Sequence, residues 1–96
     1  MRCVRLTITG KVQGVGYRLW AERTAGTLGI RGWVRNRTNG RVELQASGED
    51  AAIAALIEAC WTGPRHAAVS AVTVADSEDD GSEDDASAGF SARPTV

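Results

Sequence analysis

The first residues of the chain alternate between apolar and polar side chains, and the apolar positions are Val4, Leu6 and Ile8. A period of two is typical of a strand with one buried face, so we expect a strand here. Three glycines within residues 10–16 then predict a loop. So many glycines would weaken a continuing strand, and they let the backbone approach a ligand closely.

Two segments carry apolar residues three or four positions apart, residues 17–28 and residues 53–60. This spacing predicts two amphipathic helices. Ser47 followed by Asp50 predicts the start of the second helix, because a hydroxyl accepts from free first-turn amides and a carboxylate suits the positive helix end. Gly63, followed by a proline, predicts its end.

Three further segments are rich in Val, Ile or Trp and predict strands: residues 30–36, 41–46 and 69–75. Asn39 and Gly40 join the first two of these strands. Both residue types tolerate positive φ, which favours a tight hairpin. The side chains expected to point inward are Ile30, Val34, Val42, Leu44, Ala46, Val72 and Val74.

The order strand, helix, strand, strand, helix, strand predicts an α+β fold. We expect a ferredoxin-like βαββαβ sandwich, an antiparallel sheet with both helices on one face. Gly89 and Phe90 begin a further short strand. Pro94 has no amide donor, so this strand should be short or lie at an edge of the sheet.

A length of 96 residues with 43% hydrophobic residues suits a single domain covering residues 1–96. Within it, residues 76–88 break the pattern, because seven of the ten residues 76–85 are acidic. This segment has too little apolar surface to offset the entropy cost of ordering. We therefore expect residues 76–88 to form a mobile acidic loop.

The formal net charge of −1 is unevenly distributed: residues 1–65 hold ten Arg and Lys against five acids, and the remainder holds one against seven. A basic body favours a small anion or a nucleic acid as partner, although a solvated arginine-rich surface explains the same count. The chain has no apolar run of membrane-spanning length and its start is unlike a signal peptide, so we expect a cytoplasmic protein without a membrane partner.

Residues 10–18 lie between the first predicted strand and the first predicted helix. A helix start leaves backbone N–H groups unpaired and carries partial positive charge, so a phosphoryl group fits there. Arg18 adds a planar fork of donors. The segment lacks the Lys-Ser/Thr ending of a P-loop, and Gly14-x-Gly16 lacks the third glycine of a dinucleotide fingerprint. A tight turn that serves only packing would explain the same glycines.

Asn36 ends the second predicted strand and is the second candidate. A carboxamide both accepts and donates hydrogen bonds, so it can hold a water molecule and a ligand oxygen together. Alternatively, Asn36 only bonds the backbone of the turn. Cys3 and Cys60 have neither the density of a disulfide scaffold nor the spacing of a zinc site, so we interpret both as free thiols.

Residues 10–18, 29–36 and 40–43 together resemble the acylphosphatase family, small metal-independent hydrolases of the carboxyl-phosphate bond. The resemblance spans roughly residues 3–74 and implies the ferredoxin-like fold. It implies that Arg18 is a catalytic, phosphate-binding arginine and that Asn36 is the catalytic residue that orients water. The phosphate-binding loop that it implies comprises Gln13, Gly14, Val15, Gly16, Tyr17 and Arg18. It further implies a small-molecule acyl phosphate as substrate, with no cofactor and no metal.

Two other functions stay open on the residues alone. A non-catalytic phosphate or carbamoyl-phosphate binding module would keep the same anion cradle. Ferredoxin-like sheets also bind RNA through aromatic residues on their open face, but the first and third strands offer none there. We therefore expect no nucleic acid partner, and we expect a monomer. His66 and the three tryptophans are assigned no catalytic role.

Overall fold

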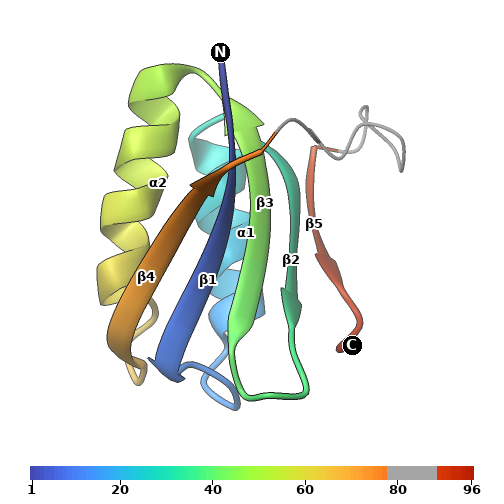
Figure 1. The fold of residues 1–96 in the computed structure, drawn as a ribbon, viewed down its shortest axis with the longest axis vertical. Coiled ribbons are helices and arrows are strands. Elements are labelled where there is room, and N and C mark those ends of the chain that lie inside the picture. The colour runs from blue at the N-terminus through green and yellow to red at the C-terminus, as the bar shows by residue number, and fades with distance from the viewer. Residues whose placement is uncertain (78–88) are drawn as a thin grey trace.

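Figure 1 shows a computed structural model of the chain, which describes residues 1–77 and 89–96. Two helices cover one face of a single five-stranded sheet. The strands are β1 (Arg2–Lys11), β2 (Arg31–Asn36), β3 (Val42–Gly48), β4 (Ala68–Asp76) and β5 (Phe90–Arg93), and the helices are α1 (Tyr17–Thr27) and α2 (Asp50–Thr62). Within the described residues, neither helix is long and apolar enough to cross a membrane. Most of the expected acidic loop, residues 78–88, lies outside the described part.

The strand order is β4-β1-β3-β2-β5. β1 runs antiparallel to both β3 and β4, and β2 runs antiparallel to β3. These four strands with both helices on one face confirm the ferredoxin-like sandwich. β5 adds a fifth strand parallel to β2, so the sheet is mixed rather than wholly antiparallel. It is four residues long and lies at the edge, which confirms the prediction made from Pro94.

The core lies between the sheet and the two helices, and the alternation along the strands determines its members. Most of the side chains expected to point inward are at most 2% exposed: Val4, Leu6, Ile8, Ile30, Val34, Val42, Leu44 and Ala46. The helices contribute Ala21, Ala25, Ile53, Leu56 and Cys60. Each fully buried large aliphatic side chain stabilises the fold by about 1.5–3 kcal/mol.

Two strand predictions were wrong in detail. β1 continues through Gly10 and Lys11, and a bulge between Thr9 and Gly10 shifts its register against β4. Val72 packs against the core as expected, but Val74 is 39% exposed on β4, which is an edge strand of the sheet.

The predicted helix cap differs from the structure, whereas the predicted tight hairpin is present between the antiparallel strands β2 and β3. Ser47 lies within β3, its side chain is buried, and its Oγ has no hydrogen-bond partner among the described residues. Pairing of β3 with β1 and β2 prevails over local capping, and α2 begins after Glu49 without a side-chain cap. In the hairpin only Gly40 has positive φ, and the Gly40 amide donates to the Arg37 carbonyl at 3.1 Å.

Candidate active site

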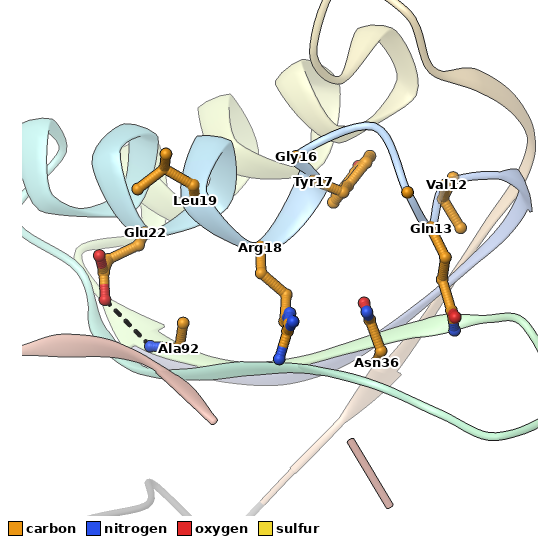
Figure 2. A pocket seen from close by; sticks show the side chains of 10 residues that line it. Val12, Gln13, Gly16, Tyr17, Arg18, Leu19, Glu22, Asn36 and Ala92 are labelled. Carbon is orange, nitrogen blue, oxygen red and sulfur yellow. Dashed lines mark hydrogen bonds between the residues drawn. The ribbon is translucent and has the colours of Figure 1, made fainter. Parts of the chain in front are cut away.

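A pocket of about 460 Å³ opens between α1, the loop before it, the end of β2 and strand β5. Figure 2 shows its lining from close by. The lining residues are Val12, Gln13, Gly14, Gly16, Tyr17, Arg18, Leu19, Glu22, Asn36 and Ala92. The pocket therefore joins residues from both ends of the sequence.

The loop between β1 and α1 forms one wall and leaves the start of α1 open. Gly14 and Gly16 have φ values of 74° and 79°, a left-handed conformation that side chains disfavour. Gly16 is the N-cap of α1, so no side chain caps the helix, and its first turn holds no acidic residue. The first-turn amides therefore remain available to an anionic ligand.

Tyr17 fixes this helix start against α2. The residue is 2% exposed, and its hydroxyl donates to the Cys60 carbonyl at 2.7 Å. Burial raises the pKa of Tyr17, chiefly through desolvation, so the phenol keeps its proton and remains a donor. Because this side chain is committed to α2, the group that Tyr17 can offer a ligand is its backbone amide.

Arg18 is held by the last strand. Its Nη1 donates to the Arg93 carbonyl at 2.9 Å. One turn further along α1, the Glu22 carboxylate accepts from the Ala92 amide at 3.0 Å. These two contacts attach α1 to β5 and fix the guanidinium, which still has further N–H donors for a ligand.

Asn36 reaches the pocket from the end of β2, and Figure 2 shows its side chain between those of Arg18 and Gln13. The Gln13 side chain donates to two carbonyls beyond Asn36, that of Arg37 at 2.7 Å and that of Arg41 at 3.0 Å. The loop before α1 is thereby tied to the hairpin that follows Asn36.

Six of the seven site residues named from the sequence line this pocket: Gln13, Gly14, Gly16, Tyr17, Arg18 and Asn36. Val15 is not in the lining, and its partly buried side chain packs against the core. Four lining residues were not among the predicted site residues: Val12, Leu19, Glu22 and Ala92. Glu22 follows Arg18 by four residues, a spacing that places both on one helix face, so this residue could have been found.

The remaining reactive side chains stand apart from this pocket. Burial raises the pKa of the Cys60 thiol to about 11, so Cys60 is a neutral core residue at physiological pH. His66 is exposed in the connection before β4. Across residues 1–77 and 89–96, no group of three His, Cys, Asp or Glu side chains is arranged to hold a metal ion.

Among the described residues, the open face of the sheet carries one aromatic residue, Trp33 on β2. It is only 5% exposed, because Arg5, Arg35 and Arg93 lie over its ring at 4.5–5.0 Å from the centroid. Glu43 pairs with Arg5 at 3.5 Å and with Arg35 at 2.8 Å. The ring is therefore covered rather than presented to a nucleic acid base.

Comparison with known proteins finds a matching family model and related sequences. The acylphosphatase family model matches residues 4–91. An acylphosphatase of Nocardioides sp. is 46% identical over 78 residues, covering 81% of this chain and 79% of that protein. One from Azorhizobium caulinodans is 52% identical over 66 residues, covering 69% and 71%.

Solved structures agree with these matches. An acylphosphatase from Coxiella burnetii superposes with a TM-score of 0.84 at 39% identity, covering 96% of this chain and 92% of the other. The acylphosphatase from Bacillus subtilis gives a TM-score of 0.80 at 30% identity, covering 100% and 98%. The similarity thus extends over the fold and nearly the full length of both chains.

Proposed function

Since this chain belongs to the acylphosphatase family, we propose that its chemistry is carried out in the pocket beside α1, with Arg18 and Asn36 as catalytic residues. The protein is an acylphosphatase, which hydrolyses the carboxyl-phosphate bond of an acyl phosphate to a carboxylate and inorganic phosphate. The observation that supports the site is that Arg18, the glycine loop and Asn36 line a single pocket.

The phosphoryl group binds between the loop and Arg18. First-turn amides of α1 donate to its oxygens, and the guanidinium adds a planar fork of charged donors. The bond from Arg18 to the Arg93 carbonyl orients that fork before the substrate arrives. These donors stabilise the charge on the transferring group, which is the main catalytic requirement of a loose phosphoryl-transfer transition state.

Asn36 positions the attacking water. The water oxygen forms a bond to phosphorus while the bond from phosphorus to the acyl oxygen breaks, and an oxygen of the substrate accepts the water's proton. The leaving group is a carboxylate, which departs without protonation, so no strong general acid is required. Positioning and charge stabilisation then account for the rate, and neither a metal nor a cofactor has a step to perform.

Two substitutions test these roles through hydrolysis of benzoyl phosphate in EDTA and the inhibition constant of inorganic phosphate. We expect Arg18→Ala to abolish both turnover and phosphate affinity. Asn36→Ala should lower kcat by about a hundredfold or more while largely keeping phosphate affinity. Asn39→Ala, which alters an exposed asparagine of the same hairpin, is the matched control. Full activity of the Asn36 variant would show that another group positions the attacking water.

The same assay distinguishes the enzyme from a phosphate or carbamoyl-phosphate binding module. A module would bind phosphate and hydrolyse nothing. The carboxamide of Asn36 beside the anion cradle favours the enzyme, because binding alone does not need a group to aim water.

We further propose a single domain over residues 1–96 that works as a cytoplasmic monomer on a small-molecule acyl phosphate, without a membrane or nucleic acid partner. One continuous core shared by the sheet and both helices supports the single domain. The arginine-covered ring of Trp33 supports the absence of nucleic acid binding.

A further inference from the structure

The pocket has two ends with different chemistry. In Figure 2, Asn36 and Gln13 lie on one side of Arg18, and Leu19, Glu22 and Ala92 lie on the other. The sheet register supports this separation: Ala92 pairs with Val34, two residues before Asn36. Two residues of strand span roughly 7 Å, so Ala92 is offset from Asn36 along the sheet by more than the size of a phosphoryl group.

In-line displacement decides which end receives the acyl group. The attacking and leaving oxygens lie on opposite sides of phosphorus in phosphoryl transfer. If Asn36 holds the water, the acyl oxygen must leave away from Asn36, toward Leu19, Glu22 and Ala92. We propose that this end of the pocket is the acyl subsite and that Glu22 makes the enzyme select acyl phosphates whose acyl group carries no negative charge. This inference rests on the roles proposed for Arg18 and Asn36.

The residues of this subsite fit a neutral acyl group. Leu19 is 50% exposed and Ala92 is exposed, so both offer apolar surface at the mouth of the pocket. The Glu22 carboxylate is held in place by the Ala92 amide at 3.0 Å. A fixed carboxylate repels a second negative charge placed beside it, whereas Arg18, one turn earlier on α1, attracts the phosphoryl group.

The decisive comparison uses two substrates that differ in a single charged group, benzoyl phosphate and 4-carboxybenzoyl phosphate. The ratio of their kcat/KM values is measured for the unmodified protein and for Glu22→Gln. Glutamine keeps an acceptor oxygen for the Ala92 amide and removes the charge. Intrinsic reactivity differs between the substrates but cancels when the two ratios are compared.

We expect Glu22→Gln to shift the ratio about two- to fivefold in favour of the 4-carboxybenzoyl substrate, the size expected for one partly exposed charge pair. The shift should shrink at high salt. Glu58→Gln removes one charge from an exposed position on α2 and should leave the ratio unchanged. A second variant, Leu19→Ala, should lower kcat/KM for benzoyl phosphate relative to acetyl phosphate, because the smaller acyl group makes less apolar contact.

Three other results would contradict the inference. An unchanged ratio in Glu22→Gln, with benzoyl phosphate still hydrolysed, would overturn the acyl subsite and leave the catalytic roles standing. An equal shift in Glu58→Gln would make the effect one of net charge and would also overturn it. Absence of hydrolysis of either substrate by the unmodified protein would overturn the proposed function together with the subsite.

Discussion

At the scale of single residues, the site depends on side chains that hold other groups in place. Arg18 is oriented by a backbone carbonyl of β5, and Tyr17 by a backbone carbonyl of α2. Neither contact involves a neighbour in sequence, so each links the helix start to a distant part of the chain. The geometry that we propose for phosphate binding is thus a property of the folded chain rather than of the loop motif alone.

The side chain of Gln13 joins the loop before α1 to the hairpin after Asn36 through its bonds to the carbonyls of Arg37 and Arg41. We predict that Gln13→Leu lowers kcat by about tenfold while phosphate inhibition changes much less, because misplacing the water relative to phosphorus costs turnover more than binding. Both constants come from steady-state assays with acetyl phosphate. Asn39→Ala serves as the hairpin control. Equal losses of kcat and phosphate affinity would instead indicate a general disruption of the loop.

At the scale of elements, β5 is the part of the fold on which Arg18 relies. Phe90 anchors this short strand in the core and is 8% exposed. We predict that Phe90→Ala destabilises the protein by about 3 kcal/mol and also weakens phosphate affinity, since the Arg93 carbonyl would no longer fix the guanidinium. Urea unfolding measures the first effect and product inhibition the second.

Ile53→Ala is the matched comparison for this strand, because it truncates a fully buried side chain of α2 that does not line the pocket. For Ile53→Ala we expect a similar loss of stability but an unchanged phosphate affinity. The affinity is measured under conditions in which both variants remain folded. If the two variants lost phosphate affinity equally, the loss would result from lower overall stability. The proposed role of β5 in orienting Arg18 would then be refuted.

The elements most accurately predicted from sequence are those with a local periodic signal. Alternation along β1 and helical spacing along α1 each report which face is buried, and the structure agrees with both. The loop motif with Arg18 and the strand-end Asn36 identified residues that share one pocket, since each stands where a regular element begins or ends.

The sequence-based predictions fail where contacts with residues distant in the sequence determine the structure. Ser47 has the local signature of a helix cap, but its pairing with β1 and β2 places it in a buried strand. The contribution of Ala92 to the pocket requires β5 to lie parallel to β2, which follows from no pattern within residues 89–96. The arginines that lie over the Trp33 ring likewise come from three different strands.

At the scale of the whole molecule, two titratable groups are buried where α1 meets α2. The Tyr17 hydroxyl contacts the backbone of Cys60, and burial raises the pKa of both groups by penalising their charged forms. Folding therefore favours the protonated state of each. Stability gained in this way is linked to pH.

Alkaline pH should consequently destabilise the protein through the junction of the two helices. The pKa of Cys60 rises from about 9 in the unfolded chain to about 11 in the fold, so its contribution is complete below pH 9 and is lost as pH rises through 11; Tyr17 acts in the same direction. We predict a fall in the free energy of unfolding across this window, measured by urea denaturation at several pH values. Cys60→Val should make the fall shallower, whereas Cys3→Val should not. Parallel curves for the unmodified protein and Cys60→Val would show that this thiol does not govern the alkaline limit.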